Sequence, residues 1–360
     1  MRLLILAVAS AVLLQTSGSA PARMETAQTR TSFAAQIEAL SERGGYFDTD
    51  NLISNERSYL EVLPELKKRG VRGGAYIGVG PDQNFSYIAA VRPDIAFIVD
   101  IRRDNLLLHL LFKALFQLAG TRVEYLALLL GRPVPSGADW KNASLEKVLA
   151  QVEGAQLDAR GVAALRARVD EAITRTGVTL AREDRTTIDR FHRRFIEAGT
   201  GLQFQSTGRP PQSHYPTYRD LLLATTYDGE KANYLATEES FLFVKSLEER
   251  DLILPVVGDL SGSRALAAVG EVLTRKKIRL SALYASNVEF YLFSDGRFDA
   301  FATNLARLPR ADHAVVIRSV FGRYGFPRGG SVSQLQNVGE MVEGLAKGRF
   351  RYYDELINGR

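Results

Sequence analysis

The chain has 360 residues, of which 46% are hydrophobic and 24% charged, so it is long enough to bury a sizeable core and is expected to be globular. Its 46 lysines and arginines exceed its 41 aspartates and glutamates, but the excess is spread along the chain without a basic stripe bearing interleaved aromatic residues, so nucleic-acid binding is not expected. The lack of cysteine excludes disulfides, a thiolate nucleophile and a Cys-based metal site.

The first 22 residues have the features of a secretory signal peptide. Arg2 precedes an apolar run from Leu3 to Leu14, and small residues with an A-x-A-like cleavage site follow. This run is too short to span a bilayer, and no later stretch reaches the ~18 apolar residues of a membrane helix. We therefore expect an exported protein, periplasmic or extracellular, with no membrane span after signal cleavage. In the alternative, Met24 is the true start and the protein is cytoplasmic.

Residues 23–70 are predicted to form a mainly helical N-terminal segment. The stretches "SFAAQIEALSER" and "SYLEVLPELKKRG" carry apolar residues at spacings of three and four, as amphipathic helices do. Between them, Asn55, Glu56 and Tyr59 lie in a polar stretch just ahead of the first strand. This stretch is interpreted either as a lid over a site or as an ordinary helix-capping loop.

Residues 71–120 alternate between strands and helices. A strand is predicted over 74–80 and a helix over 84–92, which the Arg92-Pro93 step ends. The unbroken apolar run "IAFIVDI", residues 95–101, is typical of a strand covered on both faces of a parallel sheet. An apolar helix follows and stops at Gly120.

The pattern changes over residues 121–215, where amphipathic helices separated by glycines indicate a helical insertion. Its densest basic run, "RFHRR" at 190–194, is expected on the outer face of a helix. Alternation resumes over 216–330, and residues 331–360 are expected to add a helix and a tail. The resumed elements are strands over 252–260, 279–293 and 313–321 and helices over 263–278 and 298–307. The order predicts an α/β fold with a doubly wound, mostly parallel, Rossmann-like sheet.

Candidate binding residues follow from where the strands end, because ligands of open parallel sheets bind outside the carboxyl ends of the strands. Gly78, Gly80 and Asp82 lie at the end of the first strand, Asp100 ends the second, and Asp259 ends the third. Asp100 lies twenty positions after Gly80. At this spacing a carboxylate accepts the ribose hydroxyls of a ligand that rests on the glycine turn.

The turn disfavours a pyrophosphate. Gln83 stands where a dinucleotide-binding turn has its third glycine, and Asp82 places a carboxylate at the helix start that a pyrophosphate would use. S-adenosylmethionine has no phosphate and carries a sulfonium and an ammonium, so an acidic neighbour suits it.

These segments resemble the class I S-adenosylmethionine-dependent methyltransferase fold. "YIGVGP" resembles its glycine-containing motif, "FIVDIRRDN" its acidic second strand end, and "VVGDL" and "LYASNVEFYL" the third and fourth strand ends. The resemblance covers roughly residues 71–120 and 250–323 and implies a methyltransferase-like exported bacterial family. It implies that Gly78 and Gly80 line the methionine part of S-adenosylmethionine, Asp100 the ribose and Asp259 the adenine edge.

Candidates for a catalytic base are Glu56 and Glu289. Asn287 and Glu289 lie two positions apart in the strand expected over 279–293, so they are predicted to share a face and to converge on a ligand. The four histidines have no metal-ligand spacing and are expected to be structural, so no metal is predicted.

Structural explanations exist for the same residues. The glycines could simply permit a tight turn, Asp100 could pair with Arg102 or Arg103, and Asp259 could act only near a helix N-terminus.

Three functions therefore stay open: an S-adenosylmethionine-dependent methyltransferase, an exported non-catalytic protein that keeps the fold but binds another ligand or partner, and a nicotinamide-dependent oxidoreductase. The methyl acceptor, the oligomeric state and the role of the helical insertion are not predicted.

Overall fold

The computed structural model describes residues 31–136, 139–209, 212, 214–321 and 330–359. Ser32–Arg360 forms one compact unit. The predicted signal peptide lies outside the described residues, so the expectation of export stays a prediction. None of the helices in the described part of the chain is long and apolar enough to cross a membrane.

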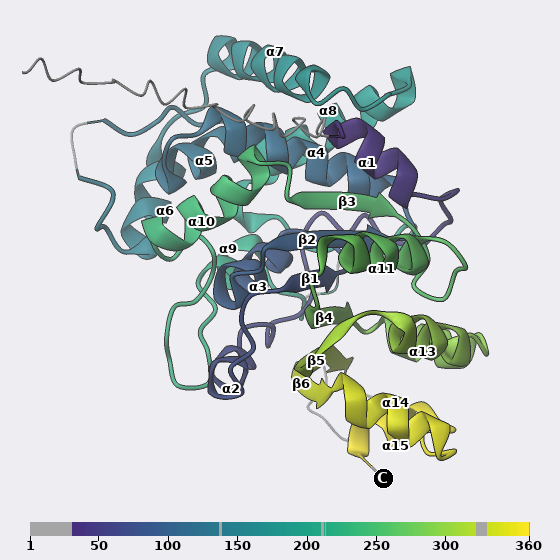
Figure 1. The fold of residues 1–360 in the computed structure, drawn as a ribbon. Coiled ribbons are helices and arrows are strands. Elements are labelled where there is room, and N and C mark those ends of the chain that lie inside the picture. The colour runs from purple at the N-terminus through teal and green to yellow at the C-terminus, as the bar shows by residue number, and fades with distance from the viewer. Residues whose placement is uncertain (1–30, 137–138, 210–211, 213, 322–329, 360) are drawn as a thin grey trace, which may run out of the picture. The chain divides into compact units, whose positions relative to one another are not determined.

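A six-stranded sheet in the order β3-β2-β1-β4-β5-β6 forms the centre of the fold (Figure 1). Its first five strands are parallel, and β6 is antiparallel to β5. The α/β class with a mostly parallel sheet is therefore confirmed. The strands are β1 (Ala75–Gly78), β2 (Ile95–Asp100), β3 (Ile253–Val257), β4 (Leu280–Ser286), β5 (Arg310–Phe321) and β6 (Ser331–Asn337).

Helices cover both faces of the sheet, as the chain alternation requires. On one face α3 (Gln83–Val91), α4 (Arg103–Leu118) and α10 (Glu238–Glu249) pack together, and on the other α1 (Phe33–Leu40), α11 (Ala265–Lys276), α13 (Phe298–Arg307) and α14 (Val338–Ala346) pack in a row. The remaining helices are α2 (Leu63–Lys68), α5 (Arg122–Leu129), α6 (Leu145–Gly154), α7 (Ala159–Arg175), α8 (Arg182–Ala198), α9 (Tyr218–Leu222), α12 (Val288–Ser294), α15 (Tyr353–Asn358) and the short 3-10 helix η1 (Gly199–Gly201).

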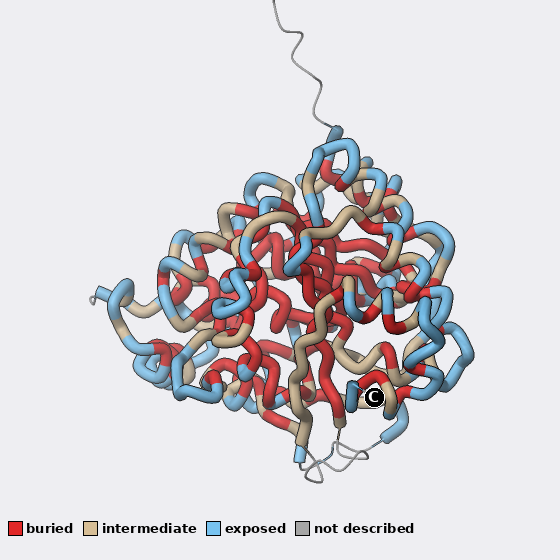
Figure 2. The backbone as a smooth tube through the Cα atoms, turned by 60° about the horizontal axis from the view of Figure 1, so that its bottom comes forward, coloured by how far each residue is buried: buried red, intermediate tan, exposed pale blue. Residues whose placement is uncertain are grey.

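Three strands of the sheet are completely buried. Every residue of β1, β2 and β3 is buried, and apart from Asp100 these strands lack charged residues, as expected of strands covered on both faces. Figure 2 shows the buried segments gathered in the interior and the exposed ones around the outside. In contrast, every residue of β6 is only half-buried. The amphipathic helices expected between β2 and β3 are present, and α6, α7 and α8 are the clearest of them.

Three predictions of secondary structure are wrong. The strand expected over 279–293 ends at Ser286, which has a φ of 51°, and α12 follows it. Residues 331–337, expected to begin a helix, form β6, and the helix begins only after the side chain of Asn337 caps it. Both helices expected within residues 23–70 form, as α1 and α2, but they are shorter than expected, so the described part of this segment is not mainly helical.

Candidate ligand site

The glycine turn between β1 and α3 is filled by side chains of the protein. A Cβ atom on Gly78 would lie 1.9 Å from Asn84 Oδ1. Asn84 Nδ2 donates to the carbonyl oxygens of Val79 and Pro81, at 2.8 and 2.7 Å, and Tyr76 Oη donates to Asn84 Oδ1 at 2.8 Å. Gly78 therefore leaves room for Asn84, which holds the turn from within.

Gly80 provides the conformational freedom of this turn. Its φ of 80° is strained for any residue with a side chain. His109 Nε2 lies 2.9 Å from the carbonyl oxygen of Gly80, and since a carbonyl accepts, Nε2 is the protonated nitrogen. Burial lowers the pKa of His109 to about 4, so the ring is neutral and acts as a structural donor.

Asp82 turns its carboxylate away from the start of α3. It occupies the position that precedes the helix but makes no side-chain cap. Instead, the carboxylate accepts hydrogen bonds from Tyr218 Oη at 2.8 Å and Tyr234 Oη at 3.4 Å. Burial raises the pKa of Asp82 to about 6, although the two tyrosine hydroxyls act in the opposite direction. Its partners are thus tyrosines of the segments that cover α3.

Asp100 pairs with Arg102, which is one of the structural explanations that the sequence offered for this carboxylate. Arg102 donates from its backbone nitrogen and Nε to Oδ1, at 2.9 and 3.1 Å, and from Nη2 to Oδ2 at 2.9 Å. Both residues are buried, and Arg102 Nη1 also donates to the carbonyl oxygen of Thr49 at 3.0 Å. Both carboxylate oxygens expected to accept ribose hydroxyls are therefore already engaged.

Asp259 organises the turn that follows β3. Its Oδ1 accepts from the backbone nitrogen and hydroxyl of Ser261, at 2.8 and 2.7 Å, and its Oδ2 lies 2.6 Å from Arg297 Nη2. The role near a helix start that the sequence allowed fits this arrangement.

Glu56 fastens the N-terminal segment to the ends of β4 and β5. Its fully buried carboxylate accepts from Tyr284 Oη at 2.6 Å and from the hydroxyls of Ser286 and Ser319. Burial raises its pKa, while the three hydroxyl donors oppose that shift. No described residue forms an ion pair with Glu56, which makes it an acid held by hydroxyl groups alone.

The predicted convergence of Asn287 and Glu289 is wrong, because they lie at the start of α12 and not on one face of a strand. Glu289 forms a buried bidentate pair with Arg318, and Arg318 Nη2 also donates to Gln336 Oε1 at 2.7 Å. This pair links α12 to β5 and β6. Glu289 therefore has a structural partner and no open side.

The histidines are dispersed. His192 is buried with Nε2 3.0 Å from the carbonyl oxygen of Leu128, and His214 and His313 are exposed. Within the described ranges, no three His, Asp or Glu side chains are grouped to hold a metal ion.

An open pocket of about 450 Å³ lies beside Arg102, outside the end of β2. Thr49 and Ser206 form an antiparallel bridge that joins two of its walls, and Thr207 donates from its backbone nitrogen to the carbonyl oxygen of Asp48 at 2.7 Å. Its lining comes from the N-terminal segment (Gly45, Tyr46, Phe47, Thr49, Asp50, Leu52), the start of α4 (Arg102, Arg103, Asp104), α8 (Arg190, Phe191, Arg194) and the stretch after η1 (Gln205, Thr207).

The sequence did not identify this pocket. Arg190 and Arg194 belong to the basic run 190–194, which lies on α8 as expected, but nothing in the sequence indicated that these side chains border a pocket. The other walls are brought together only by the tertiary fold.

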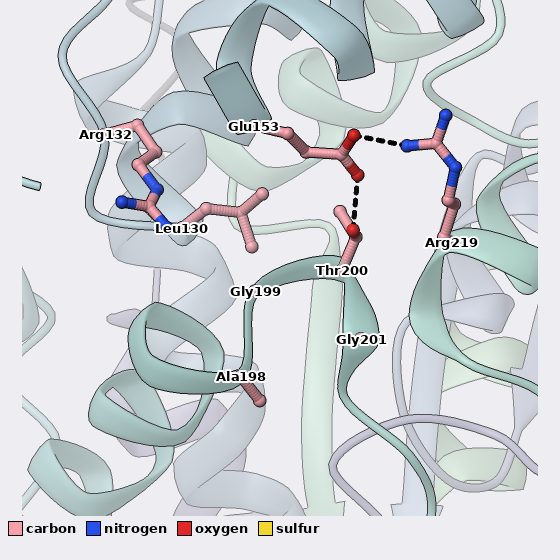
Figure 3. Close-up of a pocket in the computed structure, with 8 residues that line it drawn as sticks. All are labelled: Leu130, Arg132, Glu153, Ala198, Gly199, Thr200, Gly201 and Arg219. Atoms are coloured by element: carbon pink, nitrogen blue, oxygen red, sulfur yellow. Dashed lines mark hydrogen bonds and ion pairs between the residues drawn. The ribbon is translucent and has the colours of Figure 1, made fainter. Parts of the chain in front are cut away.

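A second hollow of about 460 Å³ lies between α6, η1 and α9 (Figure 3). Glu153 occupies its rim and accepts hydrogen bonds from the hydroxyl of Thr200 and the guanidinium of Arg219. Glu153 therefore ties α6 to η1 and α9 at this hollow.

The sheet and the pocket at its carboxyl edge define an α/β protein compatible with a Rossmann-like fold. Residues 51–152 and 204–357 match the model of a family described as a domain of unknown function (DUF7790), which covers more than half of the chain, so the chain belongs to this family. The interval between the two matched segments contains α7, α8 and η1. No curated protein matches the chain.

Proposed function

We propose that this protein binds a small molecule other than S-adenosylmethionine, in the pocket beside Arg102, on a sheet of the methyltransferase type that no longer serves methyl transfer. Export through residues 1–22 is part of the same proposal. The strand order β3-β2-β1-β4-β5, followed by an antiparallel strand, supports the methyltransferase type of fold.

The observation that carries the proposal is the pairing of Asp100 with Arg102. An adenosine ribose needs the carboxylate oxygens that Arg102 now occupies. Breaking a buried ion pair costs about 3–5 kcal/mol, and a ligand with a Kd of about 1 μM has only about 8 kcal/mol of binding free energy in total. A ligand in the pocket beside Arg102 leaves the Asp100–Arg102 pair intact and avoids this cost.

Titration calorimetry tests the proposal. With S-adenosylmethionine we expect a Kd weaker than about 1 mM, because the turn is filled and Asp100 is paired. Micromolar binding that Asp100→Ala weakens at least about tenfold would restore the methyltransferase function. Mass spectrometry of protein purified from its native compartment adds an independent result, since it identifies both the processed N-terminus and any co-purifying small molecule.

Methyl transfer is the second candidate function. It is favoured by the strand order and by Glu56, a buried carboxylate at the ends of β4 and β5, where the resemblance places the substrate-facing motif. A nicotinamide-dependent oxidoreductase is not proposed, because Gln83 replaces the third glycine and its amide donates to Tyr284 Oη at 3.2 Å.

A further inference from the structure

Two of the four arginines that line the pocket beside Arg102 have their charge balanced by buried or half-buried aspartates. Arg102 pairs with Asp100, and Arg103 forms a bidentate pair with Asp184 at 2.9 and 2.7 Å. These two guanidinium groups shape the wall of the pocket. Their positive charges are balanced by the paired aspartates, so they contribute little to recognition of a further anion.

Arg190 lies at the outer rim of the pocket. Its guanidinium is 3.7 Å from Asp104, and both side chains are at least half exposed. An exposed pair of this kind is screened by solvent and salt. It adds neither a strong attraction nor a strong repulsion for a bound molecule.

Arg194 differs from the other three. It is half-buried on α8, and its Nη2 donates to the neutral Gln205 Oε1 at 3.1 Å. Among the residues that the structure describes, no carboxylate forms an ion pair with it. Asp50 lies within electrostatic reach: burial raises its pKa, the charge of Arg194 acts in the opposite direction, and its Oδ1 accepts from the backbone nitrogen of Gln205 at 3.3 Å. A guanidinium beside a cavity with N–H groups to spare is suited to bind a carboxylate through two hydrogen bonds.

Aromatic side chains provide the apolar part of the same cavity. Phe47 is fixed edge-on against Tyr291, with ring centroids 5.0 Å apart, and Phe191 is buried. Tyr46 is 76% exposed at the mouth, an unusual position for so large an apolar side chain. A cavity of about 450 Å³ lined in this way is within the size range of small-molecule sites.

The charge balance selects a monoanion over a dianion. Arg194 supplies one positive charge and forms no ion pair with a carboxylate of the described residues, whereas the carboxylate of Asp50 lines the same pocket and would repel a second negative charge. We propose that the pocket binds an aromatic monocarboxylate, with its carboxylate on Arg194 and its ring against Phe47 and Tyr46. This inference rests on the proposed function, which it narrows to a ligand class.

Calorimetric titration of the full chain with benzoate, benzamide and inorganic phosphate tests the inference. Benzoate is expected to bind with a Kd on the order of 1 mM, as suits so small a ligand, and benzamide and phosphate at least about tenfold more weakly. Arg194→Gln should weaken benzoate binding at least about tenfold. The control Arg193→Gln alters the neighbouring arginine, which is exposed, pairs with Asp189 and lies outside the pocket lining, and should leave the affinity within about twofold.

A pocket-filling variant separates this inference from the proposed function. Thr207 is exposed and lines the pocket, so Thr207→Trp should block ligands without disturbing the core. Unchanged benzoate affinity in Arg194→Gln, equal binding of benzamide or phosphate, or no benzoate binding at about 10 mM overturns the inference. If Thr207→Trp still abolishes retention of a different co-purifying molecule, the proposed function stands and only the ligand class is wrong. Micromolar binding of S-adenosylmethionine that depends on Asp100 overturns the proposed function itself.

Discussion

The turn between β1 and α3 is packed with the protein's own side chains, whereas the pocket of about 450 Å³ beside Arg102 is left open. Both regions contain carboxylates together with guanidinium or amide groups. In the filled turn, Asn84, Asp82 and Asp100 are satisfied by partners from the chain. In the pocket, Arg194 keeps hydrogen-bonding capacity to spare. The comparison teaches that a motif at the end of a strand identifies a position, while the partners of its polar groups decide whether that position serves stability or binding.

The largest effect is expected from Asp100→Asn. This change leaves the buried Arg102 charge without its partner, which should lower the free energy of unfolding by about 3–5 kcal/mol in urea denaturation. The control Asp104→Asn affects an exposed pair and should cost less than about 1 kcal/mol. Equal costs for the two variants would show that Asp100 is not part of a tightly coupled pair.

A pH series compares wild type with Asp82→Asn. The folded-state pKa of Asp82 is raised from 3.8 to about 6, so its stabilising effect is complete below about pH 4 and is lost as pH rises through 6. The variant lacks this titrating group, so its free energy of unfolding should rise by on the order of 3 kcal/mol relative to that of the wild type between pH 4 and 7. Thermal unfolding at each pH measures this difference, and a difference independent of pH would contradict the assignment. Tyr218→Phe removes one hydrogen-bond donor to the carboxylate, so it should raise the folded-state pKa of Asp82 further and extend the loss of stability to higher pH than in the wild type.

Gly78→Ala tests how tightly the turn is filled. Its Cβ would collide with Asn84 Oδ1 and with the ring of Tyr76, so we expect a loss of about 2 kcal/mol in the free energy of unfolding. Gly154→Ala is the matched control, since a Cβ there meets nothing within 4 Å and Gly154 ends a helix. The control should be neutral or slightly stabilising. A turn with spare room, such as one built for a cofactor, would tolerate both changes equally.

The smallest effect on stability is expected from Arg194→Gln. Its guanidinium has a neutral partner and borders a cavity, so urea denaturation should give a free energy of unfolding within about 1 kcal/mol of wild type. A larger loss would mean that Arg194 supports the fold, as Arg102 does, and the contrast between the two regions would disappear.

Much of the sheet could be predicted from the sequence, because β1, β2 and β3 are covered on both faces and, apart from Asp100 at the end of β2, carry no charged residues. The end of β4 could not be placed, since the apolar residues after it suit either a strand or a helix and the positive φ of Ser286 decides between them. The strand β6 was missed because it is half-buried, rich in serine and glutamine, and lacks the apolar pattern of an inner strand.

The site was harder to predict than the fold. The order of residues correctly placed Asp100 at the end of a strand and offered Arg102 as its partner, since both are close in sequence. The role of Asn84 inside the turn has no sequence signal, because it depends on the space that Gly78 leaves by having no side chain. Whether the carboxylate of Asp82 faces a ligand or two tyrosines likewise depends on α9 and on Tyr234, far along the chain.

The bridge between Thr49 and Ser206 joins stretches from the beginning and the middle of the chain. Closing so long a loop of chain has a high entropic cost, so we expect this bridge to form only after the elements between the two stretches have folded. A nascent chain that has not yet emerged past position 207 has no pocket at all. A ligand of this pocket can therefore bind only after residue 207 has emerged and cannot template the folding steps that precede it.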